Sequence, residues 1–222
     1  MTHAVSRVWV FDAYGTLFDP AALTPLLDAW LPGRGAALAQ AWRETQLRYT
    51  WLRTLLGRWA PFDSVTADAL RYTLRSAGVE PDGRFIDEAL AAYQTLPPYP
   101  EVRDVLQELD GRAVLLSNGT RTMLESATRA AGLAARFAAI LSSDDVAVYK
   151  PDPRIYGLVG EELGIAPRDV RFVSGNGWDC AGAAAVGFEV IRIARTASPG
   201  DELGVPPPAR TLRDLHGLLD SR

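Results

Sequence analysis

The stretch RVWVFDAYGTLFD, residues 7–19, is the starting point for the fold. Its first five residues, 7–11, form a short apolar and β-branched run of the kind that makes a buried strand. The run stops at Asp12, and Gly15 marks the turn that follows. The sequence therefore predicts a strand whose carboxyl end presents a carboxylate.

Similar apolar runs recur along the chain and alternate with segments of helical periodicity. The runs lie at residues 113–116, 139–141, 170–173 and 190–193. Helices are expected at residues 101–109, 121–131, 153–163 and 178–186, and Gly132, Gly164 and Gly187 follow three of them as C-terminal caps. This alternation is typical of βαβ units, so we predict an α/β fold with a Rossmann-like parallel sheet core.

The interval 18–96 interrupts the alternation, because it contains amphipathic stretches and no convincing strand. Leu23, Leu26, Leu27, Trp30 and Leu31 fall on one helix face. Further helices are expected at residues 36–56, after a cap at Ser64 and up to Gly78, and at residues 85–93. We predict an inserted helical cap subdomain at residues 18–96 and a Rossmann-like catalytic core at residues 1–17 and 97–222, with Pro206-Pro207-Pro208 as a spacer before a terminal helix.

Composition narrows the class of protein. The 222 residues are 48% hydrophobic and 23% charged with a net charge of −4, which suits a globular chain and offers no basic surface for nucleic acid or anionic membrane. No apolar run approaches the roughly 20 residues of a membrane span, and residues 1–20 do not read as a signal peptide. We expect a cytoplasmic protein that binds neither nucleic acid nor membrane. The single cysteine, Cys180, excludes an intrachain disulfide and a thiolate metal site.

Chemistry-bearing residues follow several of the predicted strands. Ligands of open parallel sheets bind beyond the carboxyl ends of the strands, where the strand order reverses. The residues at this edge are Asp12, Tyr14 and Thr16 after the first strand, Ser117, Asn118 and Gly119 after the second, Lys150 in a loop after the third, and the stretch 174–179 after the fourth. A carboxylate, a lysine, hydroxyls and amides are thus expected to converge.

These residues resemble the motifs of type II L-2-haloacid dehalogenases, within the haloacid dehalogenase superfamily. The matching stretches are FDAYGTLFD at 11–19, Trp42-Arg43 leading to Tyr49-Thr50-Trp51, SNG at 117–119, YKP at 149–151 with Tyr156, and SGNGWD at 174–179. They lie in order over most of the chain.

The resemblance implies hydrolytic dehalogenation of short-chain L-2-haloacids to D-2-hydroxyacids, through an aspartyl ester and with inversion. It makes Asp12 the nucleophile and Arg43 the residue that clamps the substrate and receives the halide with Asn118 and Trp178. Tyr14 and Leu47 are expected in the same substrate site. Positions that orient Asp12, bind the substrate carboxylate or support ester hydrolysis are matched by Thr16, Ser117, Lys150, Tyr156, Ser174, Asn176 and Asp179. The resemblance also implies a homodimer that needs no cofactor and no metal.

The physical requirements of this chemistry agree with these residues. A carboxylate fixed about 3 to 3.5 Å behind an sp³ carbon, dry and aligned, gains several kcal/mol of barrier reduction. Lys150 is expected to keep Asp12 ionised. Arg43, the Asn118 amide and the edge of the Trp178 ring are suited to the departing halide. Water must then cleave the ester, with Asp179 or Lys150 to activate it.

Two alternatives belong to other classes of protein. A Mg²⁺-dependent phosphatase of the same superfamily resembles this chain but needs a second Asp where Tyr14 stands, and commonly a metal-binding carboxylate where Asn176 stands. A nucleotide-binding module is suggested by Gly175-x-Gly177 between a strand and a helix, although Cys180 takes the place of the third glycine. Both rank below the dehalogenase.

Two departures from the dehalogenase pattern bear on the pocket. Glu44 stands beside Arg43 where the resemblance implies an amide, and a carboxylate there can pair with Arg43 and weaken its hold on an anionic substrate. Gly175 and Gly177 replace small side chains, which predicts a looser pocket.

Overall fold

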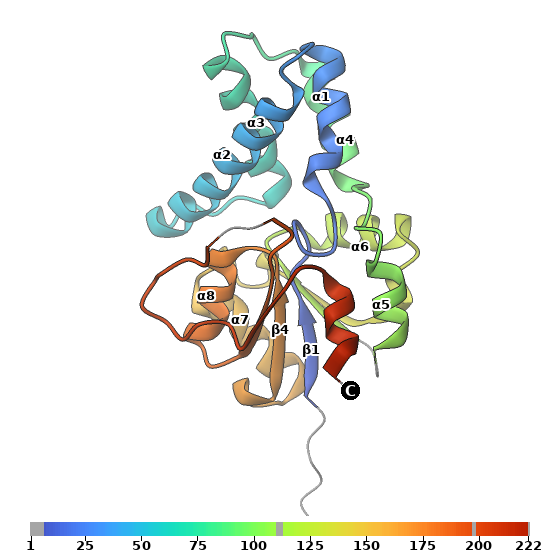
Figure 1. Cartoon of the computed structure of the whole chain (residues 1–222). Coiled ribbons are helices and arrows are strands. Elements are labelled where there is room, and N and C mark those ends of the chain that lie inside the picture. Colours follow the sequence, from blue (N-terminus) through green and yellow to red (C-terminus); the bar gives the residue numbers. More distant parts are fainter. Residues whose placement is uncertain (1–6, 110–112, 197–198, 222) are drawn as a thin grey trace, which may run out of the picture.

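The computed structural model describes residues 7–109, 113–196 and 199–221 (Figure 1). Residues 1–6 of the expected core segment 1–17 lie outside the described residues, as do 110–112, 197–198 and 222 of the segment 97–222.

A parallel sheet forms the centre of the molecule, as the apolar runs predict. Its strands are β1 (Val8–Phe11), β2 (Ala113–Ser117), β3 (Phe137–Ser142), β4 (Val170–Ser174), β5 (Glu189–Ile193) and β6 (Arg210–Leu212), in the order β3-β2-β1-β4-β5-β6. All of the pairings are parallel. The α/β fold class is confirmed, and β6 is a strand that the sequence pattern did not predict.

Helices cover both faces of the sheet (Figure 1). They are α5 (Val102–Glu108), α6 (Arg121–Ala130), α7 (Pro153–Leu163) and α8 (Gly177–Ala185). Because successive strand residues face opposite sides, Phe11 packs in a cluster with Val105 of α5, whereas its neighbour Val10 packs in a second cluster with Ile155 of α7. Strand β2 in the middle of the sheet is buried along its whole length, which explains its continuous apolar run.

The strand order reverses beside β1. The chain runs from β1 outward through β2 to β3 and then crosses back, so that β4 pairs with the opposite side of β1. The loops after β1 and β4 therefore meet at the switch point of the sheet, where ligands of such folds bind.

Helices occupy the interval between β1 and α5. They are α1 (Thr24–Trp30), α2 (Gly35–Leu56), α3 (Phe62–Ser76) and α4 (Gly83–Gln94), and they lie beyond the carboxyl edge of the sheet (Figure 1). One detail differs from the prediction, and one cap was not predicted. Ser64 does not cap α3, because that helix already begins at Phe62 after Pro61, and the cap found on α4 is Asp82, whose side chain accepts from the Phe85 amide at 3.0 Å.

The C-terminal segment also differs from the prediction. The proline run 206–208 is followed by strand β6, and the terminal turn at Leu215–Ser221 is a 3₁₀ helix. Within the described ranges, no helix combines the length and apolarity that crossing a membrane requires.

Candidate active site

Asp12 ends β1 and presents a nearly buried carboxylate, 5% exposed, at the switch point. Its Oδ2 accepts hydrogen bonds from Thr16 Oγ1 and from Asn176 Nδ2, both at 2.8 Å, and lies 3.5 Å from Ser174 Oγ. Its Oδ1 accepts from Lys150 Nζ at 3.0 Å. The two oxygens are therefore unequal, since one is held by neutral donors and the other faces a cation.

Two glycines bring the loops after β1 and β4 together. Gly15 has a φ of +85°, which a side chain rarely tolerates, and turns the chain so that Thr16 points back at Asp12. A Cβ on Gly175 would lie 2.3 Å from the Gly15 carbonyl oxygen, and the Gly175 amide donates to Thr16 Oγ1 at 2.8 Å. The expectation that Gly175 loosens the pocket is wrong, because backbone fills the space beside it.

Gly177 differs from Gly175, because the atom that a Cβ there would meet, at 2.0 Å, is Oδ2 of the exposed and movable side chain of Asp201. This carboxylate sits against the first residue of α8. The looser pocket expected at Gly177 therefore stays a prediction. A phosphate bound at this helix end would meet the negative charge of Asp201. The position of Asp201 disfavours the nucleotide-binding alternative.

Lys150 connects two carboxylates. It is completely buried, and its Nζ lies 3.0 Å from Asp12 Oδ1 and 2.9 Å from Asp179 Oδ2. Its backbone amide donates to Asn118 Oδ1 at 2.8 Å, which anchors the loop to the end of β2. Burial by itself would lower the pKa of Lys150, but Asp12 and Asp179 outweigh it and raise that pKa above its ordinary value. Lys150 is therefore a fixed cation.

Asp179 is held in the first turn of α8 and is completely buried. Tyr156 OH donates to its Oδ1 at 2.7 Å and Ser174 Oγ donates to its Oδ2 at 3.0 Å. Burial raises the pKa of Asp179 to about 6, and the nearby negative charge of Asp12 acts in the same direction, against the lowering effect of Lys150. Burial also raises the pKa of Tyr156, so its hydroxyl stays a donor.

Arg43 reaches the site from α2. Its guanidinium is half-buried and donates to the Tyr14 carbonyl at 3.3 Å, to Gln46 Oε1 at 2.8 Å and to Tyr93 OH at 3.4 Å. Gln46 is fully buried and is itself held by Thr66 Oγ1 at 2.7 Å. Neither Gln46 nor Tyr93 was predicted from the sequence as a site residue. The spacing of Gln46, three residues after Arg43 on one helix, was an available signal, whereas Tyr93 on another helix gave none.

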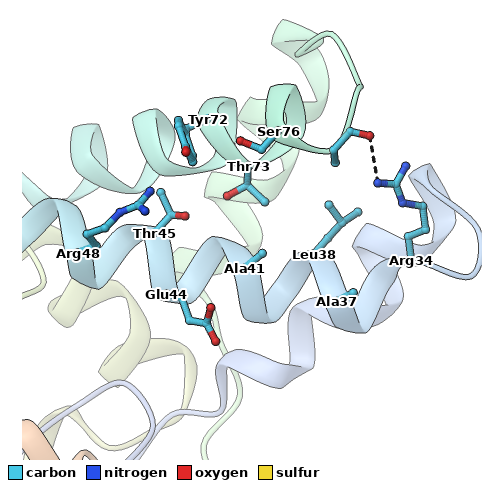
Figure 2. A pocket seen from close by; sticks show the side chains of 11 residues that line it. Arg34, Ala37, Leu38, Ala41, Glu44, Thr45, Arg48, Tyr72, Thr73 and Ser76 are labelled. Carbon is cyan, nitrogen blue, oxygen red and sulfur yellow. Dashed lines mark hydrogen bonds between the residues drawn. The ribbon is translucent and has the colours of Figure 1, made fainter.

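Glu44 does not pair with Arg43, so that expectation is wrong. Its Oε1 accepts from Gln40 Nε2 at 2.9 Å, one helical turn earlier, and no ion pair joins it to Arg43 in the part of the chain that the structure describes. Glu44 instead lines a groove of about 560 Å³ between α2 and α3, together with Arg48 and Tyr72 (Figure 2).

Tyr14 contributes chiefly through its backbone. Its carbonyl accepts from Arg43 and, at 3.0 Å, from Asn176 Nδ2, so it joins the helical segment to the loop after β4. Its ring is buried against Phe62, with ring centroids 5.9 Å apart, and its hydroxyl has no hydrogen-bond partner among the described residues. Burial raises the pKa of Tyr14 well above its ordinary value.

The remaining predicted residues lie around this network with fewer contacts to it. Ser117 Oγ accepts from the Gly119 amide at 3.2 Å at the end of β2. Trp178 packs edge-on against Trp51 of α2, with ring centroids 5.6 Å apart. Leu47 lies one turn after Arg43 and is half-buried. Within the described structure, neither Trp178 nor Leu47 makes a hydrogen bond or ring contact with the network around Asp12.

The site places a buried carboxylate among cations and neutral hydrogen-bond donors. Asp12 is nearly buried, held on one oxygen by two neutral donors and paired through the other with the Lys150 cation. The Arg43 guanidinium is bonded to the Tyr14 carbonyl, two residues after Asp12. This arrangement suits attack by a carboxylate on an anionic substrate. In the described residues, no three His, Cys, Asp or Glu side chains are grouped so as to hold a metal ion.

Comparison with known proteins gives a consistent result. The family model of haloacid dehalogenase-like hydrolases matches residues 7–187. The (S)-2-haloacid dehalogenase of Xanthobacter autotrophicus is 47% identical over 84% of this chain and 74% of its own length, and that of Pseudomonas sp. strain YL is 42% identical over 89% and 86%. A solved structure of L-2-haloacid dehalogenase from Xanthobacter autotrophicus with chloropropionic acid covalently bound superposes with a TM-score of 0.91, at 40% identity over 96% of both chains. The chain therefore belongs to the haloacid dehalogenase-like hydrolases, in the branch of the (S)-2-haloacid dehalogenases.

Proposed function

We propose that this protein hydrolyses short-chain L-2-haloacids to D-2-hydroxyacids through an ester on Asp12. The observation that carries the proposal is the unequal environment of the Asp12 oxygens. Thr16 and Asn176 hold Oδ2, whereas Oδ1 has Lys150 as its partner and is the oxygen better suited to attack. The solved relative with covalently bound chloropropionic acid supports an enzyme-linked intermediate.

In the first step Oδ1 attacks C2 of the substrate, and the halide leaves from the opposite side. This geometry inverts the configuration, so an L-2-haloacid yields a D-2-hydroxyacid. Arg43 already donates to Tyr14, Gln46 and Tyr93, which fixes its guanidinium and leaves its remaining N–H groups for an anion. We assign Arg43 to the substrate and the departing halide, and we assign Asn118 and Trp178 to the halide beside it.

In the second step water cleaves the ester at the Asp12 carbonyl, and we propose Asp179 as the base. Lys150 is unsuited to that role, because its raised pKa keeps it protonated at neutral pH. Asp179 has a pKa of about 6 and is therefore mostly ionised at pH 7. It is close to Asp12, because Lys150 Nζ contacts both carboxylates. The proton that Asp179 takes from water passes to the departing hydroxyacid oxygen.

Labelled water tests this mechanism. In a single turnover with excess enzyme in ¹⁸O water, an ester intermediate places the heavy oxygen on the peptide that contains Asp12 and leaves the hydroxyacid unlabelled. The label in the hydroxyacid alone would show direct attack by water on C2. Absence of halide release from every L-2-haloacid tested would reject the function itself.

Three further properties complete the proposal. The chain divides into a core at residues 1–17 and 97–222 and a helical cap at residues 18–96. Two chains form a homodimer, which is supported by the exposed Leu52, Leu55 and Leu56 near the end of α2 and is measurable by analytical ultracentrifugation. A cytoplasmic location is testable by fractionation of the producing cells.

A further inference from the structure

The chain passes twice between the sheet and the helical segment, and the two passages lie side by side. The backbone amide of Asp19 donates to the Pro97 carbonyl at 3.0 Å, and that of Tyr99 donates to the Leu17 carbonyl at 2.9 Å. These bonds form a short two-stranded ladder directly after Thr16, the residue whose hydroxyl holds Asp12.

Arg195 follows β5 and contacts both passages. One end of its guanidinium donates to the Thr16 carbonyl at 2.9 Å and the other donates to Glu101 Oε1 at 2.7 Å. Its central carbon lies 3.4 Å from the centroid of the Tyr99 ring. A planar guanidinium can make two directed hydrogen bonds and stack on a ring at the same time, which lysine cannot do.

The carboxylate partner of Arg195 is buried. Glu101 precedes α5 and is 7% exposed. Removing its carboxylate from water is unfavourable, so the fold needs the contact with Arg195 to offset that free energy. Because Arg195 bonds both Glu101 and the Thr16 carbonyl, the ion pair fixes the backbone position of Thr16, which is fully buried. Thr16 Oγ1 donates to Asp12 and accepts from the Gly175 amide, so a shift of its backbone would disturb both.

We propose that Arg195 is a positioning residue for ester formation, which locks the ladder to Thr16 and through Thr16 aims the Asp12 carboxylate. This inference rests on the proposed function. Arg195 makes no contact with Asp12 in the described structure, so its effect on the reaction must pass through Thr16. Misplacement of a reacting group by about 1 Å can lower a rate about a hundredfold, which makes such a lock consequential.

The first test compares Arg195→Met with a matched control, Arg53→Met. Arg53 also pairs with a carboxylate, Asp68 at 2.9 Å, and also donates to a backbone carbonyl, that of Arg58. Among the described residues it bonds to neither Thr16 nor Asp12. The rate of ester formation per folded enzyme should fall about 10- to 100-fold in Arg195→Met with little change in KM, and it should stay unchanged in Arg53→Met. Arg195→Lys should lie between Arg195→Met and wild type. Equal rates in Arg195→Met and wild type would overturn the proposal.

The second test asks whether the effect passes through Thr16. Thr16→Val removes the hydroxyl that holds Asp12, so adding Arg195→Met to Thr16→Val should cause little further loss in ester formation. A merely structural role predicts that the two losses multiply, and that outcome would overturn the proposal. If Arg195→Met does not fold, Arg195→Lys, which keeps the charge beside Glu101, goes through the same cycle.

A measurement without substrate separates failure of this inference from failure of the proposed function. If the wild type releases no halide, the function fails, and the carboxyl ¹³C NMR signal of Asp12 then decides the role of Arg195. That signal is assigned by its loss in Asp12→Asn. It should move in Arg195→Met and not in Arg53→Met, and an unmoved signal in Arg195→Met would reject the positioning role.

Discussion

At the scale of single residues, the site is organised around one buried cation between two carboxylates. Lys150 lies within 3.0 Å of both Asp12 and Asp179 and has no exposed surface. Taking three charges out of water is unfavourable, and apolar residues of similar volume would stabilise the fold at least as well. The cluster is therefore better explained by chemistry than by stability, as is common where buried groups have displaced pKa values.

Removal of the Arg43 side chain should affect turnover far more than stability. Arg43→Ala should lower turnover of L-2-chloropropionate by about two to three orders of magnitude, because it removes a donor to developing negative charge. The free energy of unfolding should change by about 1 kcal/mol or less, since Arg43 is half-buried and its partners keep other contacts. Steady-state kinetics and chemical denaturation measure the two quantities.

The neighbouring position supplies the control for this experiment. Glu44→Gln should leave KM for the anionic substrate unchanged, because Glu44 is bonded to Gln40 rather than to Arg43. A lower KM in Glu44→Gln would show that the two residues do compete in solution. If Arg43→Ala instead lowered the free energy of unfolding by as much as it raised the activation free energy, the role of Arg43 would be structural.

Among the secondary-structure elements, the sequence predicted five of the six strands of the sheet but not the edge strand β6. Strand β2 has a continuous apolar run because it is buried on both faces. The other longer strands are mostly apolar, although Arg171 interrupts β4 and Arg192 interrupts β5. β6, which reads Arg210-Thr211-Leu212, is short, pairs with β5 alone and lacks such a run.

The same contrast applies to the candidate site. The residues that follow strands were predictable, because parallel topology brings the carboxyl ends of strands to one edge. Arg43 was reached only through its resemblance to a family motif. The contacts of Arg43 with Tyr93 and of Arg195 with Glu101 join residues far apart in sequence, so no local pattern encodes them.

A side chain at Gly175, in the loop between β4 and α8, should lower both stability and activity. Gly175→Ala places a Cβ against the Gly15 carbonyl and must push the two loops apart. We expect a loss of about 1 to 3 kcal/mol in stability, as for other overpacked sites, together with slower ester formation, because the Gly175 amide is a partner of Thr16.

Gly157→Ala is the matched control for this substitution. Gly157 lies within α7 and has open space where a Cβ would stand. The control should retain activity and gain about 0.5 to 1 kcal/mol, since alanine favours a helix over glycine. A fully active and stable Gly175→Ala protein would show that the loops can separate without consequence.

At the scale of the whole molecule, one prediction separates this chain from phosphatases that share its fold. The position that a phosphatase needs for its second Asp holds Tyr14, and Asn176 stands where a metal-binding carboxylate is common. Halide release should therefore survive prolonged treatment with EDTA. Activity that disappears with EDTA and returns with Mg²⁺ would favour the phosphatase class instead.

Asp12 and Asp179 both contact Lys150, so a change in the charge of Asp12 alters the pKa of Asp179. While Asp12 is a free anion, its charge helps to raise the pKa of Asp179. Alkylation cancels that charge, so the pKa of Asp179 should fall below about 6 as soon as the ester forms. Ester formation therefore increases the ionised fraction of Asp179, which is the form that accepts a proton from water. Rapid-quench measurement of ester hydrolysis should show a rate that declines only as the pH falls through this lowered value, and a midpoint at or above pH 6 would show that the two carboxylates are not coupled.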